Sequence, residues 1–201
     1  DVVEKAGVPM LQNALVTLAG WINSLPPSIV QTRPGLISLR GPILAIKGDL
    51  QGSLELLDTA VAIYRKNQNI SGLIPALIRR ANTLRFLGNY SASLENINEA
   101  LKLAGRDASL QYYYAEGLRL KGLNLYRLGE SRQAVEALEH SLSLYSAMKE
   151  DARIPLVLME TGMVHGSVGA IDSARVSYQK ALTLKQAESD LFTQADILNN
   201  L

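Results

Sequence analysis

The residues that could support catalysis or metal binding are few and scattered along this chain. The sequence of 201 residues has no cysteine and two histidines, His140 and His165, and neither histidine has a partner at i+4. A phosphate-binding loop needs Lys and then Ser or Thr after its last glycine, but the nearest match, 117–122, is followed by Leu123 and Asn124. We therefore interpret both histidines as surface or packing residues and expect no catalytic residue, no metal and no cofactor.

Charge is distributed unevenly between successive segments of the chain, and this pattern is more informative. Segment 74–87 has three arginines and no acidic residue, and 115–128 has three basic residues and one acidic residue. Segments 90–104 and 131–150 each have one more acidic than basic residue. The net charge of +1 for the whole chain hides this separation. The near-neutral net charge also argues against a protein that binds nucleic acid or an acidic membrane mainly by electrostatic attraction.

The basic segments predict a groove that binds a ligand or a partner. Taking Leu77 and Leu118 as the buried direction of two helices, we expect residues turned away from them to line this groove. The predicted groove consists of Asn82, Arg85, Phe86, Glu116, Arg119, Leu123, Tyr126, Arg127, Met159 and Met163. Arginine pairs well with carboxylates, and methionine adapts to varied partners. The expected ligand is therefore an anionic or hydroxyl-rich small molecule, or an acidic peptide.

Some of these side chains also have a purely structural interpretation. Long basic side chains can pack their stems on a neighbouring helix and keep their charged ends in water. We expect this of Arg40, Arg80 and Lys121, whereas for Arg85, Arg119, Tyr126 and Arg127 both interpretations stand. Solvated helix surface is expected for Glu116, Glu136, Glu139 and Glu160. The run Tyr112–Tyr114 is expected to pack between neighbouring repeats, with an exposed binding surface as the alternative.

These segments belong to a sequence repeat of 40 to 41 residues, which is marked by Gly48, Gly88, Gly129 and Gly169. Each repeat is predicted to form two amphipathic helices, because apolar residues recur with helical spacing, as in 70–87. The glycine tolerates left-handed backbone and is expected to end the first helix. Small residues are predicted to let the paired helices approach closely. They include Ala81, Gly122 and Gly162.

The chain is expected to divide into a lead-in and an array of repeats. Residues 1–33 are predicted to form a lead-in helix, over 9–25, and a proline-rich connector. Residues 34–201 are predicted to form four helix pairs and the start of a fifth, so we interpret the chain as a segment of a longer array. Pro42 is expected to kink or split the first helix of this array. The predicted fold class is all-α, a right-handed solenoid of stacked helix pairs.

The helix pair with its glycine and small-residue columns resembles the tetratricopeptide repeat (TPR) over residues 34–201, although its period exceeds the usual length of about 34 residues. Four short stretches also resemble the opening of the TPR-like sensor region in MalT-like transcriptional regulators of the LuxR family. They are 21–26, 33–36, 39–41 and 48–50. Such regulators are signal-transduction ATPases with an N-terminal nucleotide-binding module and a C-terminal helix-turn-helix. No segment of this chain matches either module, so ATP binding and DNA binding are not assigned to it.

The resemblance implies a non-catalytic sensor region that binds an effector or partner protein in the groove and controls self-association. It also implies a cytoplasmic location away from membranes, which the lack of cysteine favours as well. DNA would be bound by a separate C-terminal domain of such a regulator. The alternative is a TPR adaptor that binds an extended peptide or a helix of a partner protein.

Overall fold

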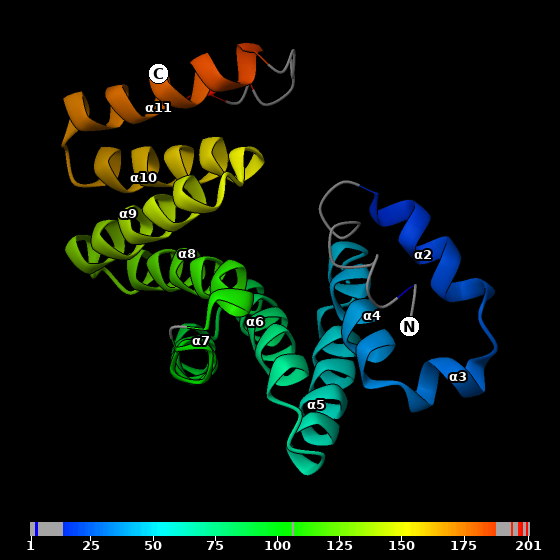
Figure 1. The fold of residues 1–201 in the computed structure, drawn as a ribbon. Helices are drawn as coiled ribbons and strands as arrows, with labels where there is room; N and C mark the ends of the chain where they lie inside the picture. Colours follow the sequence, from blue (N-terminus) through cyan, green and yellow to red (C-terminus); the bar gives the residue numbers. More distant parts are fainter. Residues whose placement is uncertain are drawn as a thin grey trace. The chain divides into compact units, whose positions relative to one another are not determined.

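The computed structural model describes residues 3, 14–105, 107–187, 194, 197, 198 and 200 (Figure 1). The α-helices are α2 (Leu15–Ser24), α3 (Pro27–Thr32), α4 (Pro34–Ile46), α5 (Leu50–Lys66), α6 (Ile70–Phe86), α7 (Tyr90–Ala104), α8 (Gln111–Arg127), α9 (Ser131–Met148), α10 (Ile154–Ser167) and α11 (Ile171–Ala187). Two short 3-10 helices are η1 (Ala108–Leu110) and η2 (Asp151–Arg153). No strand occurs among the described residues. The chain forms two compact units, 1–104 and 105–201.

In the first unit, successive helices pack as neighbouring pairs. Helix α4 packs against α5 and α6 against α7, while α5 also packs against α6 and so joins the two pairs. The short helices α2 and α3 pack on α4. Together these three helices bury Leu18, Ile22, Val30, Leu36, Leu39 and Ile43. The residues predicted as a lead-in therefore contribute to the core of the first unit.

The second unit repeats the same arrangement of helix pairs. Figure 1 shows α8 beside α9 and α10 beside α11, and α9 packs against α10. The last pair is held by a core of Leu158, Ala174, Tyr178, Ala181 and Ile197. The predicted fold class, an all-α solenoid of TPR-like helix pairs, is confirmed within each unit.

A glycine with positive φ follows the first helix of each pair, as predicted. The φ angles are +90° at Gly48, +77° at Gly88, +86° at Gly129 and +77° at Gly169. Glycine adopts this conformation without the steric cost that a side chain brings. In the first pair the next residue, Asp49, caps the second helix by accepting a hydrogen bond from the Gly52 backbone N–H at 2.8 Å. Each turn therefore ends one helix and begins the next within a few residues.

Glycines also let paired helices approach closely at the predicted positions. A Cβ atom built on Gly122 of α8 would lie 2.7 Å from Leu138 Cγ and 2.9 Å from the carbonyl oxygen of Ala134, both on α9. A Cβ atom on Gly162 of α10 would lie 2.9 Å from the ring of Tyr178 on α11. The small-residue prediction is confirmed at both sites, because a side chain would collide with the partner helix.

Buried serines add hydrogen bonds between helices, which the repeat pattern alone does not indicate. Ser53 Oγ lies 3.0 Å from Thr83 Oγ1, and the Ser93 hydroxyl donates to the carbonyl of Ala81 at 2.7 Å. In the second unit Ser141 donates to a carbonyl of α8 at 2.8 Å. The three serines are fully buried. Their hydroxyls are thus satisfied without water, as buried polar groups must be.

The structure differs from the sequence predictions at Pro42 and at the start of the lead-in helix. Of the kink or split expected at Pro42, the split does not occur, because α4 is one helix that contains this proline. The kink stays a prediction. Burial of its neighbours, including Leu39 and Ile43, stabilises the helix despite the backbone hydrogen bond that proline removes. Of the predicted helix 9–25, the described part begins at Ala14, and α2 starts at Leu15. Most of the predicted start of a fifth pair lies outside the described residues.

Candidate functional site

A buried group of charged side chains lies in the second unit, where α8 packs against α9 and α10. Arg119 on α8 donates two hydrogen bonds to Glu116, from Nε to Oε2 at 3.0 Å and from Nη2 to Oε1 at 2.7 Å. Its Nη1 donates to Oε1 of Glu160 on α10 at 2.5 Å. The side chains of Arg119, Glu116 and Glu160 are only 10%, 15% and 14% exposed. One cation therefore joins two carboxylates and connects the first helices of successive pairs.

Tyrosine and arginine side chains from neighbouring elements extend this group. The hydroxyl of Tyr145, a fully buried residue of α9, donates to Glu116 Oε2 at 2.7 Å. Arg153 of η2 donates through Nη2 to the Tyr112 hydroxyl at 2.6 Å. We call the six residues the ion-pair cluster: Tyr112, Glu116, Arg119, Tyr145, Arg153 and Glu160. Its two glutamates and two arginines balance in charge.

Burial and ion pairing shift the pKa values of Glu116 and Arg119 in opposite directions. Burial raises the pKa of Glu116, but the Arg119 guanidinium outweighs this effect, with help from Arg153 and the Tyr145 hydroxyl, and the pKa falls to about 2. Burial lowers the pKa of Arg119, but Glu116 and Glu160 raise it well above its usual value. Burial, and then the Glu116 carboxylate, raise the pKa of Tyr145. The tyrosine therefore keeps its proton and acts as a donor.

The expectation that Glu116 and Glu160 lie on solvated surface is wrong. Both carboxylates are drawn into the interior because a buried guanidinium needs acceptors for its hydrogen bonds. Glu136 and Glu139 are exposed, as expected. The predicted groove therefore included one carboxylate of the cluster and missed the other.

Repeat spacing is the sequence signal that could have indicated these contacts. Arg119 and Glu160 are separated by 41 residues, and so are Tyr112 and Arg153. The repeat spacing here is 40 residues, as between Gly129 and Gly169, so each pair joins positions one residue away from equivalence. Stacking places such positions of successive repeats close together. In the first unit, Arg79 donates to the Ser38 hydroxyl at 2.7 Å across the same separation.

Besides Glu116, two further residues of the predicted groove lie in the interior of the second unit. Arg119 is held by the ion-pair cluster, and Leu123 is 7% exposed and belongs to the core. Tyr126 is half-buried, whereas Arg127 is exposed. The open part of the predicted surface on α8 is therefore its last turn.

An arginine and an aromatic residue lie together at the last turn of the first helix in two repeats. The Arg127 guanidinium carbon lies 5.7 Å from the ring centre of Tyr126. The Arg85 guanidinium carbon lies 4.3 Å from the ring centre of Phe86. Both distances fall within the range of cation–π attraction. We call these the terminal Arg–aromatic pairs, and each is followed by an exposed leucine, Leu87 or Leu128.

The other predicted groove residues are divided between the two units. In the first unit, the Asn82 side-chain oxygen accepts hydrogen bonds from Arg85 at 3.2 and 3.0 Å. In the second unit, Met159 packs partly against the core of α10 and α11, and Met163 is half-buried. Asn82, Arg85 and Phe86 lie together in the first unit, and Tyr126 and Arg127 in the second. The groove itself stays a prediction.

The charged end of Arg80 is bonded to protein groups in addition to its expected packing. It donates to Asp58 Oδ1 on α5 at 2.5 Å and to Asn96 Oδ1 on α7 at 3.0 Å. These acceptors come from the second helices on either side, so the arginine connects three helices. Asp58 therefore balances one of the three positive charges that the sequence places on α6. Lys121 is half-buried.

His140 and the tyrosine run make ring contacts. His140 is exposed and its ring centre lies 6.1 Å from that of Tyr114. Tyr112 packs edge-on against Tyr113 and Tyr145, and its hydroxyl reaches the next repeat through Arg153. In the part of the chain that the structure describes, no group of His, Asp and Glu residues could hold a metal ion. No helix in that part is long and apolar enough to cross a membrane.

One segment of the chain matches a known family. Residues 74–107, which contain most of α6 and all of α7, match the family model of the tetratricopeptide repeat. No curated protein sequence matches the chain.

Solved structures show the same fold over most of the chain. The apo form of RapI has a TM-score of 0.74 at 13% identity, over 98% of this chain and 73% of RapI. A Rap protein in complex with competence and sporulation factor has a TM-score of 0.77 at 13% identity, over 96% and 53%. A signal transduction ATPase with numerous domains and a tetratricopeptide repeat sensor, from Pyrococcus horikoshii, has a TM-score of 0.76 at 17% identity, over 86% and 26%.

The chain thus spans about half of the second of these proteins and about a quarter of the third. At such low identities the similarity concerns the fold alone. Together with the match over 74–107, it identifies the fold of this chain as a TPR-like helical repeat.

Proposed function

We propose that this chain is the sensor and protein-interaction region of a cytoplasmic, MalT-like transcriptional regulator of the LuxR family. In this role it performs no chemistry. It binds an effector or partner protein on the first helices of its repeats and controls self-association of the regulator. The observation that carries the proposal is the presence of the terminal Arg–aromatic pairs, Arg85 with Phe86 and Tyr126 with Arg127, at equivalent places in two repeats.

The composition of these pairs suits recognition. Residues that dominate binding energy at interfaces are enriched in tyrosine, tryptophan and arginine. Phe86 is 56% exposed, and the leucines that follow the pairs, Leu87 and Leu128, are 42% and 46% exposed. Each pair therefore offers apolar area for a partner to bury and a guanidinium that can bind a carboxylate.

The comparisons support a role in sensing. One similar structure belongs to a signal transduction ATPase whose tetratricopeptide repeats are its sensor, and another is a Rap protein in complex with a factor. Their shared fold is one in which stacked helix pairs create extended surfaces for binding. The resemblance of 21–50 to MalT-like sensor regions directs the proposal toward a transcriptional regulator.

The ion-pair cluster could couple ligand binding on this surface to the packing of one repeat on the next. Arg119 connects α8 to α10, two turns of helix before Tyr126 on the same helix. A ligand that binds at Tyr126 and favours one packing of α8 on α10 shifts the population toward that packing. Only a difference in affinity between the two packings can produce this shift.

The proposal is tested by locating where ligands bind. The ¹⁵N-labelled chain is titrated with sugars, sugar phosphates, dicarboxylates and an acidic peptide, and backbone amide shifts are followed by NMR. The proposal predicts that a member of this panel shifts amides in the last turns of α6 or α8. Shifts confined to other helices, or no binding by any member at millimolar concentration, would contradict it.

The alternative function is a TPR adaptor that binds a peptide or helix of a partner protein. The exposed leucines beside the terminal Arg–aromatic pairs favour this alternative, because they suit an amphipathic partner better than a sugar. Binding of the acidic peptide at these turns, with no response to any small molecule, would favour the adaptor. The sequence of the full gene separates the two functions further, since the regulator requires a nucleotide-binding module and a helix-turn-helix.

A further inference from the structure

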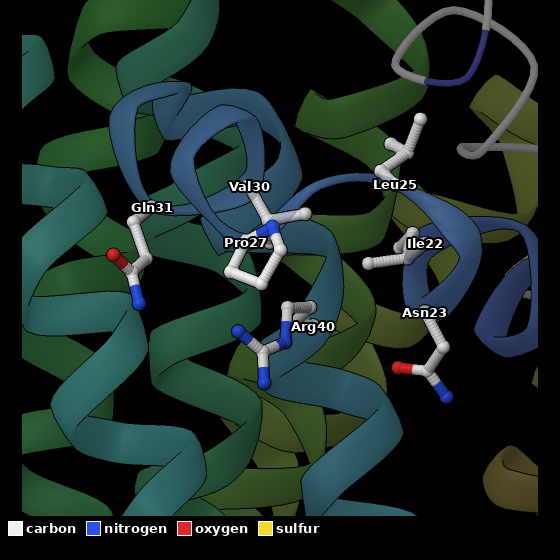
Figure 2. A pocket seen from close by; sticks show the side chains of 7 residues that line it. All are labelled: Ile22, Asn23, Leu25, Pro27, Val30, Gln31 and Arg40. Atoms are coloured by element: carbon white, nitrogen blue, oxygen red, sulfur yellow. The ribbon is translucent and has the colours of Figure 1, made fainter.

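A pocket of about 220 Å³ lies in the first unit between α2, α3 and α4 (Figure 2). It is lined by Ile22, Asn23, Leu25, Pro27, Val30, Gln31 and Arg40. The side chains of Ile22 and Val30 are buried and form its apolar part. In Figure 2 the Arg40 guanidinium lies below Pro27, with the amides of Asn23 and Gln31 to either side. One cation and two amides thus line a pocket that also has an apolar part.

Arg40 makes no hydrogen bond and no ion pair with any protein group, among all the contacts of the described residues. The side chain is only half-buried, so water can reach its five N–H donors. An arginine directed at a pocket with no protein acceptor is available to bind an anion there. Arg79, Arg80, Arg85 and Arg119 on the first helices each donate to a protein acceptor, and Arg40 does not.

The next repeat shows what a structural arginine at this position needs. Arg80 occupies the position equivalent to Arg40, and it is held by Asp58 and Asn96. Forty residues before these two acceptors the sequence has Leu18, in the lead-in helix α2, and Leu56, in α5. Neither leucine can accept a hydrogen bond through its side chain. Arg40 thus lacks acceptors like those that hold Arg80, and it lines the pocket.

We propose that this pocket binds a carboxylate that carries a short apolar chain. Arg40 binds the carboxylate through paired hydrogen bonds, which is the geometry that a guanidinium favours. The amides of Asn23 and Gln31 donate further hydrogen bonds, and the hydrocarbon chain contacts Ile22 and Val30. The ligand is either a free small acid or the C-terminal carboxylate of a peptide that ends in an apolar residue. The site lies apart from the terminal Arg–aromatic pairs and does not depend on the function proposed for them.

The pocket is partly open to solvent, so its volume limits only the part of a ligand that it holds. Because a water molecule takes up about 30 Å³ of liquid, the pocket has room for roughly seven water-sized groups. Drug-sized ligands occupy larger sites, of about 300 Å³ or more. A branched acid such as 3-methylbutanoate fills this space, and so does the last residue of a peptide that ends in leucine.

The test is a titration of the whole chain with three probes. They are 3-methylbutanoate, its neutral analogue 3-methylbutanamide, and N-acetylglycyl-leucine, and the readout is the NMR shifts of the Asn23 and Gln31 side-chain amides. We expect one or both acids to shift these signals in a saturable way at millimolar concentration, and the neutral amide to bind at least tenfold more weakly. Binding of 3-methylbutanoate identifies a small-acid site, and binding of the dipeptide alone identifies a peptide C-terminus.

Matched variants separate binding from folding. Arg40→Gln should weaken binding of the acid at least tenfold, because a charge-assisted interaction is lost. It should leave the thermal unfolding midpoint unchanged, because Arg40 supports no protein group. Lys47→Gln removes the same charge from the exposed end of the helix and should not affect binding. Equal binding of acid and neutral amide, equal binding by Arg40→Gln, or no response to either acid would each overturn the proposal.

Discussion

At the scale of single residues, Arg119 decides whether two buried glutamates can keep their charges. Removing one partner of a buried ion pair leaves an uncompensated charge, which typically costs about 3–5 kcal/mol of stability. Arg119→Ala should therefore destabilise the chain by about that amount in urea unfolding. Arg132 is the matched control, because it pairs with Glu136 at 93% and 62% exposure. Arg132→Ala should cost less than about 1 kcal/mol, and equal effects of the two variants would contradict this view of the cluster.

Acid should weaken the fold through Glu116. Folding lowers the pKa of this carboxyl from 4.5 to about 2, so its contribution to stability is complete above about pH 5. The contribution is lost as the pH falls toward 2, because the unfolded state then binds the proton more readily. At about 1.4 kcal/mol per pKa unit, the loss is roughly 3 kcal/mol. Urea unfolding between pH 6 and 2 measures it.

Glu116→Gln supplies the control for this pH dependence. The variant should be less stable than the wild type at pH 6, since glutamine cannot neutralise Arg119. It should also lose less stability on acidification. A pH profile of the same slope for both proteins would show that other carboxyl groups cause the effect.

At the scale of elements, the glycines of α8 and α10 determine how closely paired helices pack. Gly122→Ala should destabilise the second unit by about 1–2 kcal/mol. The added Cβ would collide with Leu138 and Ala134 of α9, and this strain exceeds the gain of up to about 1 kcal/mol in helix propensity. Gly166→Ala is the control within the same unit.

A Cβ on Gly166 of α10 would have a single neighbour, at the ordinary distance of 3.9 Å. Gly166→Ala should therefore leave stability unchanged or raise it by up to about 1 kcal/mol. Thermal unfolding of both variants measures the difference. A destabilised Gly166→Ala, or a stabilised Gly122→Ala, would contradict the close-approach argument.

The elements were largely predictable from the sequence, whereas the contacts between repeats were not. The turn at Gly88 and the small residue at Gly122 follow from local rules on backbone freedom and helix packing, which the sequence displays directly. The burial of Glu160 depends on Arg119 of the preceding repeat, so its own helix periodicity indicates an exposed residue. The pocket at Arg40 depends on how α2 and α3 pack on α4. Such features require knowledge of which side chains meet in space.

At the scale of the whole molecule, the division into 1–104 and 105–201 makes a prediction about local stability. In a repeat protein each helix pair depends chiefly on its neighbours, and contacts concentrate within each unit. Arg119→Ala should therefore lower hydrogen-exchange protection over α8 to α11 much more than over α4 to α6. Mass spectrometry of exchanged peptides measures this difference. Equal loss of protection in both units would show that the chain unfolds as one cooperative body.

The central claim is that the last turn of α8 belongs to a binding surface for an effector or partner. The most direct measurement is the dissociation constant of the panel member that binds best, for the double variant Tyr126→Ala/Arg127→Ala and for Lys180→Ala, an exposed control on α11. We predict that the double variant binds at least tenfold more weakly while its unfolding midpoint stays close to that of the wild type. Affinity equal to that of the wild type and of Lys180→Ala would contradict the claim.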